Sequence, residues 1–152
     1  MMEGRFLNAK EKKPIYSALE NQFGVLQKFD SALWMNAKKR VYLVNNDIAE
    51  FPIGQIRVDS FGLYIGEFLD PAFRPSVEGS QFISHLATKN ILDLTEEQVR
   101  LYFQGDAFQI DQSLRGLFLL RSGDDIIGCA AAKDGMLINF HPKTRRIQHF
   151  HD

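Results

Sequence analysis

The dipeptide Asp134-Gly135 constrains the fold of this chain more than any other feature, because it favours the two-residue turns that join antiparallel strands. It lies between two apolar runs, Ile126 to Ala132 and Met136 to Phe140. A third apolar run, Leu117 to Leu120, comes earlier and is separated from them by Ser122-Gly123-Asp124-Asp125. The sequence therefore predicts a three-stranded antiparallel meander.

Two residues inside the middle strand of this meander carry further information. Gly128 interrupts the strand, and a glycine there usually marks a bulge or a close approach of another backbone. Cys129 is the single cysteine of the chain, which excludes an internal disulfide and a cysteine-rich zinc site. Because it lies in an apolar strand, we expect it to be a small core residue and not a nucleophile.

The first part of the chain predicts mixed structure. Ile15, Leu19 and Phe23 recur at four-residue spacing and predict a helix over residues 13–23, with Pro14 in its first turn and Gly24 as its end. Strands are predicted at 41–44, 56–58 and 63–68, and residues 48–51 form either one helical turn or irregular structure.

The following segments alternate between helix and strand. Ser76 is expected to cap a helix that ends near Thr88, and residues 91–94 are expected to form a strand. Thr95 and Gln98 then have the spacing of a capping box, which opens a helix stopped by Gly105. We place a domain boundary near residues 88–90, without a flexible linker, so that residues 1–88 and 89–152 form two modules.

Composition limits the classes of protein to which the chain can belong. Its 152 residues are 45% hydrophobic and 24% charged, as in an ordinary globular protein. No run approaches the roughly 18–20 apolar residues of a membrane span, and the N-terminal stretch lacks the apolar segment of a signal peptide. We therefore expect a cytoplasmic protein without a membrane partner.

The net charge of −1 hides a segregation of charges along the sequence. Lys and Arg outnumber Asp and Glu by eight to four in residues 1–40 and by four to two in residues 133–152, whereas residues 41–132 contain six basic and thirteen acidic residues. Such segregation is compatible with one positive face for a polyanion. The alternative is ordinary solvated surface charge.

Catalytic motifs are not found in the sequence. It contains no glycine-rich phosphate loop, no His-Glu-x-x-His and no serine in a nucleophile elbow. His149 and His151 near the C-terminus, with His141 before them, fall short of the four ligands of a structural zinc site. We therefore predict no catalytic residue, no metal and no cofactor.

The residues around Pro142 are the best candidates for a binding site. Lys143, Arg145 and Arg146, with Lys133 one strand earlier, offer cations to phosphates; we call these four residues the basic rim. Asn139 and His141 offer hydrogen bonds and a stacking ring to unpaired bases. The alternative is a solvated edge that protects the last strand.

A second basic cluster precedes the strand at 41–44. It consists of Lys38, Lys39 and Arg40. These side chains either meet a phosphate backbone or keep the edge of a sheet soluble.

The second half of the sequence resembles a known family. Residues 94–146 contain Leu101-Tyr102-Phe103-Gln104-Gly105-Asp106, Gly116-Leu117-Phe118-Leu119-Leu120 and Asn139-Phe140-His141-Pro142-Lys143-Thr144-Arg145-Arg146. This pattern resembles the PUA-like C-terminal domain of Nol/Nop/Sun-family RNA 5-methylcytosine methyltransferases. The earlier part, with Gly62-Leu63-Tyr64-Ile65-Gly66 and the helix after Ser76, is similar in layout to Nip-type ribosome-biogenesis factors.

The resemblance implies an α+β fold, in which a small α/β N-terminal module precedes a PUA-like β pseudo-barrel. It also implies binding of structured RNA in ribosome assembly, rRNA processing or RNA modification. It does not imply methylation, because those enzymes use a Rossmann-like domain for S-adenosylmethionine and a cysteine nucleophile beside a proline or threonine, and Cys129 follows Gly128.

We therefore expect a non-enzymatic RNA-binding protein that acts on ribosomal RNA or its precursor. The first alternative is a protein-interaction adaptor that docks through its acidic middle onto an RNA methyltransferase or an assembly factor. The second, less supported by the sequence, is a small enzyme with an unrecognised pocket.

Overall fold

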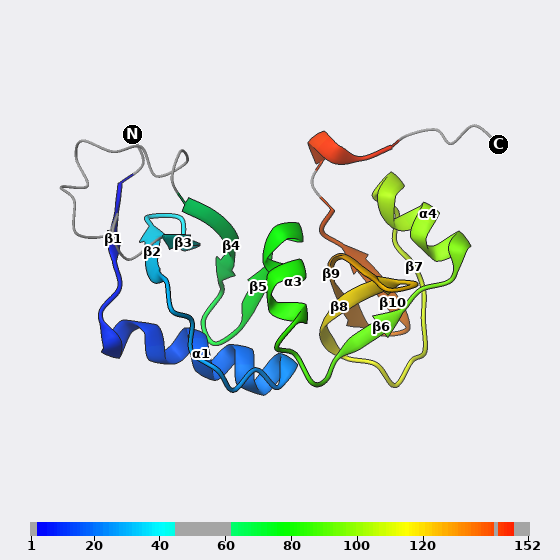
Figure 1. Cartoon of the computed structure of the whole chain (residues 1–152). Coiled ribbons are helices and arrows are strands. Elements are labelled where there is room, and N and C mark those ends of the chain that lie inside the picture. The colour runs from blue at the N-terminus through cyan, green and yellow to red at the C-terminus, as the bar shows by residue number, and fades with distance from the viewer. Residues whose placement is uncertain (1–2, 45–61, 142, 148–152) are drawn as a thin grey trace.

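The computed structural model describes residues 3–44, 62–141 and 143–147, and over these residues it shows two five-stranded sheets and three α-helices. The predicted α+β class is confirmed. Figure 1 shows the two sheets side by side, with helix α3 between them. The strands predicted at 56–58 and the turn at 48–51 lie outside the residues that the structure describes.

The first sheet is antiparallel and follows the order of the chain. Its strands are β1 (Gly4–Phe6), β2 (Ala32–Asn36), β3 (Arg40–Val44), β4 (Gly62–Phe68) and β5 (Phe73–Pro75). The predicted strands at 41–44 and 63–68 are confirmed, whereas β1, β2 and β5 were not predicted.

Helix α1 (Ala9–Phe23) packs against this sheet through Ile15, Leu19 and Phe23, which are almost completely buried. It begins four residues earlier than the apolar spacing predicted. The reason is a capping box in which the Asn8 side chain accepts from the amide of Glu11 and the Glu11 side chain accepts from that of Asn8. Pro14 consequently lies inside the helix and not in its first turn.

The second sheet contains the predicted meander. Its strands are β6 (Ile91–Asp93), β7 (Phe108–Gln109), β8 (Gly116–Ser122), β9 (Asp125–Lys133) and β10 (Met136–Asn139), in the order β6-β8-β9-β10-β7. Strands β8, β9 and β10 pair antiparallel, and β6 joins β8 in parallel. The meander and the short strand at 91–93 are thus confirmed.

Both details predicted for the meander are present. Asp134 and Gly135 have φ of 53° and 78°, the left-handed backbone of a tight hairpin turn. The register shifts between Leu120 and Arg121, where Gly128 is the partner of Leu120, so the strand is bulged at this position.

Helix α4 (Glu96–Gln104) begins at the predicted Thr95–Gln98 capping box and ends at Gly105, whose φ is 88°. It buries Tyr102 in a core shared with Phe118, Leu120 and other residues of the second sheet. The tyrosine hydroxyl lies against Gly128, where a Cβ atom would collide with it. The glycine that bulges β9 therefore also makes room for the side chain that anchors α4.

Helix α3 (Val77–Ser84) is capped by Ser76 as predicted, but it ends four residues before Thr88. Its Ile83 is fully buried in a core that also contains Leu119 of β8, so the first core extends into the second sheet. The Gln81 side chain donates to the carbonyl of Ile126 at 3.2 Å. The two modules therefore pack directly on each other, while the domain division at residue 88 stays a prediction.

Among the helices in the described ranges, none is long and apolar enough to cross a membrane.

Replacing Gly79 by alanine should destabilise the protein, although alanine favours helix by about 1 kcal/mol over glycine. A Cβ atom at Gly79 of α3 would collide with the backbone carbonyl of Ile65 in β4. We expect the free energy of unfolding to fall by about 1–3 kcal/mol, the usual cost of overpacking. Urea denaturation measures it, with Ser84→Ala on the same helix as control; a stabilised Gly79→Ala variant would contradict this packing.

Candidate nucleic-acid interface

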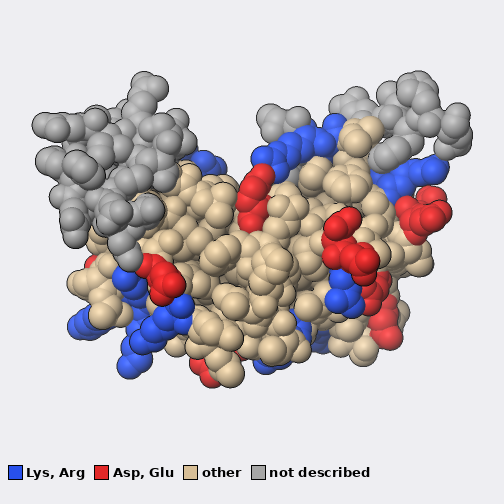
Figure 2. Space-filling view, in the orientation of Figure 1, with Lys and Arg blue, Asp and Glu red and all other residues tan. Residues whose placement is uncertain are grey.

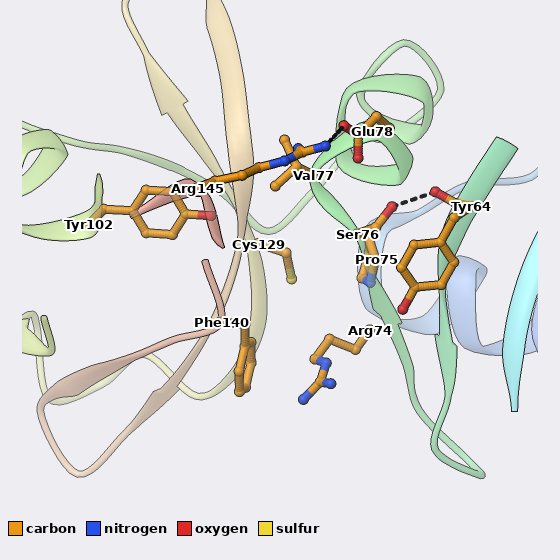
Figure 3. Close-up of a pocket in the computed structure, with 10 residues that line it drawn as sticks. All are labelled: Tyr64, Arg74, Pro75, Ser76, Val77, Glu78, Tyr102, Cys129, Phe140 and Arg145. Atoms are coloured by element: carbon orange, nitrogen blue, oxygen red, sulfur yellow. Dashed lines mark hydrogen bonds and ion pairs between the residues drawn. The ribbon is translucent and has the colours of Figure 1, made fainter. Parts of the chain in front are cut away.

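A cleft of about 300 Å³ lies where the two modules meet (Figure 3). The first module contributes Tyr64, Arg74, Pro75, Ser76, Val77 and Glu78, and the second contributes Tyr102, Cys129, Phe140 and Arg145. Figure 2 shows the surface hollowed between the modules, with basic and acidic side chains adjoining at the edge of the hollow. The cleft thus combines two cations, one carboxylate and several aromatic rings.

Arg74 of β5 and Phe140 face each other across this cleft, as Figure 3 shows. The guanidinium carbon lies 4.5 Å from the centroid of the ring, which is the geometry of a cation–π contact. On its other side Arg74 reaches Glu67 of β4 at 3.8 Å, at the outer limit of an ion pair. The guanidinium is therefore positioned by two neighbours and only weakly neutralised.

Arg145 forms the second cationic wall of the cleft. It lies in the 3-10 turn η3 (Lys143–Arg145), and its guanidinium is 2.7 Å from the Glu78 carboxylate on α3. Both side chains are partly exposed, and exposed pairs of this kind contribute only about 0–1 kcal/mol. A phosphate could therefore take the place of Glu78 at little cost.

Lys143 and Arg146 differ in their surroundings. Lys143 is exposed and makes no ion pair with any residue of the described ranges. Arg146 is half-buried: its Nε donates to the carbonyl of His141 at 3.1 Å, and its side chain lies across Gly105. Lys143 is thus available to a ligand, whereas Arg146 also supports the end of α4.

Asn139 was expected to contact bases, but its side chain faces the protein. Its Nδ2 donates to the carbonyls of Tyr102 at 2.8 Å and Asp106 at 3.0 Å, and its Oδ1 accepts from the amide of His141 at 2.7 Å. Both amide hydrogens are therefore used. Asn139 holds the end of α4 to the last strand, and its contact with bases stays a prediction.

His141 was expected to offer a stacking ring, but only 5% of the residue is exposed. The ring packs 4.9 Å from Tyr102 and 5.2 Å from Phe103, and Nε2 lies 3.3 Å from the carbonyl of Arg145. Burial lowers the pKa of His141, with a further contribution from the positive charges of Arg145 and Arg146, although the hydrogen bond to Arg145 opposes it. The ring is thus a neutral core group, and it is too deeply buried for a base to stack on it.

The remaining predicted cations are spread over the surface. Lys133 is exposed at the tip of the β9–β10 hairpin, three residues or about 10 Å along β9 from Ala130, the partner of Asn139. The basic rim is therefore not one continuous cluster: Lys143 and Arg145 share the turn η3, Arg146 lies across Gly105, and Lys133 is on the β9–β10 hairpin.

Lys38, Lys39 and Arg40 are exposed at the turn between β2 and β3. The Asn36 side chain organises this turn by accepting from the amides of Lys38 and Arg40. Arg40 pairs in register with Glu67, which in turn pairs with Arg74. Arg40, Glu67 and Arg74 thus lie side by side on β3, β4 and β5, and Arg74 lines the cleft. Of the three cations, Arg40 is therefore the one that belongs to this row.

Tyr64, Arg74 and Phe140 were missed by the sequence analysis. Arg74 lies in β5, a strand that the sequence did not predict, and the sequence shows Phe140 only as the last residue of an apolar run. A local pattern cannot identify them, because they become neighbours only when the modules pack.

The residues of the cleft give little support to a catalytic function. Cys129 is buried, as predicted, and burial raises the pKa of its thiol to about 12, so the nucleophilic thiolate is not formed at neutral pH. Over the residues that the structure describes, no group of three or more His, Cys, Asp or Glu is placed to hold a metal.

Replacing Asn139 by alanine should destabilise the second module, because three backbone groups each lose a hydrogen bond. We expect the free energy of unfolding to fall by about 2–4 kcal/mol, since an unpaired buried polar group costs roughly 1–3 kcal/mol. Urea denaturation measures it, and exposed Lys133→Ala on the neighbouring strand should change it by less than about 0.5 kcal/mol. An Asn139→Ala variant of normal stability would show that these bonds matter little.

The stability of the protein should fall as the pH drops below about 6.5, the ordinary pKa of histidine. The folded pKa of His141 is lowered, so in this window the unfolded chain binds the proton more readily than the folded one. Carboxylates with lowered pKa, such as Glu11 and Asp93, act only below about pH 4.5.

Thermal unfolding between pH 7.5 and 5.5 tests this sign. His141→Gln should show a smaller change in melting temperature across the window than the wild type, whereas His85→Gln, at the exposed position that follows α3, should behave like the wild type. An equal acid response in His141→Gln would assign the effect to other groups.

Comparison with known proteins matches residues 89–147 to the family model described as the methyltransferase RsmF PUA domain. The match spans α4, the second sheet and the segment that carries Lys143 and Arg145. No curated protein matches the chain. The likeness of the first module to Nip-type factors stays a resemblance, whereas the one drawn for the second half is confirmed. Residues 89–147 are a PUA domain of the RsmF type.

Proposed function

We propose that this chain is a non-catalytic RNA-binding protein that acts on ribosomal RNA or its precursor, in ribosome biogenesis or RNA modification. The PUA domain suggests RNA binding and is typical of proteins that modify ribosomal RNA. The observation that carries the proposal is the placement of Arg74 and Arg145 at one cleft beside Tyr64 and Phe140, with Lys143 in the same turn as Arg145. Cations next to aromatic rings are the two components of single-strand binding sites.

The charges at the cleft favour an anion despite the acidity of the chain. Arg74 and Arg145 lie beside two carboxylates, Glu67 at 3.8 Å from Arg74 and Glu78 at 2.7 Å from Arg145, so these four charges balance. Lys143, two residues before Arg145 in the same turn, brings the local charge to +1. Because exposed charges are screened within about 10 Å at 0.1 M salt, this local balance matters more for a bound phosphate than the net charge of −1.

Replacing Lys143 and Arg145 together by alanine should weaken RNA binding and flatten its salt dependence. Each phosphate contact on a single strand contributes about −0.7 to the slope of log affinity against log salt, so the slope should lose about 1.4. Fluorescence anisotropy across a salt series measures it. Lys10→Ala with Lys13→Ala removes the same charge from α1 and should leave the slope nearly unchanged.

Arg146 is kept in this test because it also supports α4. An unchanged slope in the Lys143/Arg145 variant would make these residues a solubilising edge, and a wild type without RNA affinity at low salt would refute the proposed function.

A protein-interaction adaptor is the second candidate function, and one observation supports it. Met136 and Ile138 on β10 are 36% and 42% exposed, which is unusual for two apolar residues on one face of a strand. The acidic middle is a less suitable contact than expected, since Asp93 and Glu78 are paired with arginines. Partners retained after nuclease treatment and lost in Ile138→Asp would favour this candidate.

A further inference from the structure

We infer that the cleft between the modules holds one unpaired nucleotide of a single-stranded RNA, with its base against Phe140 and Tyr64 and its phosphate on Arg74. The inference rests on the proposed function and deepens it, because it assigns the ligand class and gives the first module a part in binding. The residues involved come from both sides of the junction (Figure 3).

Arg74 is held in place before any ligand arrives. Gln22 of α1 clamps the backbone of the preceding residue: its Nε2 donates to the carbonyl of Phe73 at 2.7 Å, and its Oε1 accepts from the amide of Phe73 at 2.8 Å. The guanidinium then stacks on Phe140. Stacking covers one face of this planar group and leaves its edges, which carry the N–H donors, for a phosphate.

The aromatic residues complete the site from two directions. Tyr64 comes from β4 of the first module and Phe140 follows β10 of the second, and both are partly exposed in the cleft. Burial raises the pKa of Tyr64, so its hydroxyl stays protonated and can donate a hydrogen bond. Such rings bind any base through its π-face.

Size and hydrogen bonding restrict the occupant. The volume of about 300 Å³ is at the lower end of small-molecule pockets, which suits one nucleotide. In a duplex the bases are stacked inside the helix and cannot reach such a cleft. The Ser76 hydroxyl already donates to the carbonyl of Tyr64 and accepts from the amide of Gly79, so it stiffens the wall and does not read the base.

The ion pair between Arg145 and Glu78 closes one side of the cleft. When the next phosphate of the same strand recruits Arg145, the Glu78 carboxylate on the wall of the cleft loses its partner and can accept hydrogen bonds from a base. Binding of the nucleotide thus exchanges one exposed ion pair for contacts to the ligand, which costs little.

Two variants test the site against three probes: a labelled ten-residue uridine oligonucleotide, the same oligonucleotide without bases, and a ten-base-pair RNA duplex. Phe140→Leu should weaken binding of the oligonucleotide about 5- to 150-fold, the fold-change that corresponds to the stacking of one base. It should leave binding of the abasic probe within about twofold, because the phosphates are the same.

Arg74→Gln should weaken binding of both single-stranded probes and flatten their salt slopes by about 0.7. The duplex should bind both variants like the wild type. Arg115→Gln, which removes an exposed charge just before β8, serves as the matched control. Circular dichroism and melting temperature establish that each variant is folded.

The outcomes separate the two proposals. If Lys143→Ala with Arg145→Ala weakens RNA binding while Phe140→Leu and Arg74→Gln bind every probe like the wild type, the cleft site is overturned and the proposed function stands. If the wild type binds none of the probes, both fail. Should a cleft variant unfold, photocrosslinking of the wild type to a 4-thiouridine oligonucleotide decides: labelled peptides with Phe140 or Tyr64 support the site, and labels elsewhere overturn it.

Discussion

The packing of helix α3 between the two sheets is the interaction on which the rest of the structure depends. Gly79 lets the helix approach the backbone of Ile65 in the first sheet, and Ile83 is buried in the core that Leu119 of the second sheet completes. The junction is therefore part of a hydrophobic core and resists relative motion of the modules. The cleft has one wall on each module, so its width stays fixed only because the modules do not move relative to each other.

A second feature of the structure is that charges are paired locally. Glu78 and Asp93, two carboxylates of the acidic middle, lie against Arg145 and Arg121, so these two charges are partly neutralised. The cations around the cleft are few, but two of them stand beside aromatic rings. A protein with a net charge of −1 can therefore present a site for RNA, although its affinity should depend on short-range contacts more than on long-range attraction.

Much of the fold follows from local patterns, because the signals are local. Asp134-Gly135 specifies a turn by itself, and Thr95 with Gln98 specifies a helix start, since both features are complete within four residues. The capping box at Asn8 and Glu11 was equally readable and was overlooked in favour of the apolar spacing that begins at residue 15. The family match of residues 89–147 likewise rests on a run of sequence that the resemblance had identified.

The site itself could be predicted only in part, because side-chain direction is decided by distant residues. The types of Asn139 and His141 show that they form hydrogen bonds, but only the docking of α4 shows that their partners are Tyr102, Asp106 and Arg145. Arg74 and Phe140 were not predicted as site residues, although both line the cleft. They are 66 positions apart (140 − 74) and meet only across the junction. Neither residue has a local neighbour that would mark it as part of a site.

The central claim, that RNA binds across both modules, is tested most directly by nuclear magnetic resonance of the isotope-labelled protein titrated with a short single-stranded RNA. The account predicts that backbone amides near Tyr64 and Arg74 in the first module and near Phe140 and Arg145 in the second shift together, with one common binding curve. Shifts confined to the second module, or centred on α1, would contradict it.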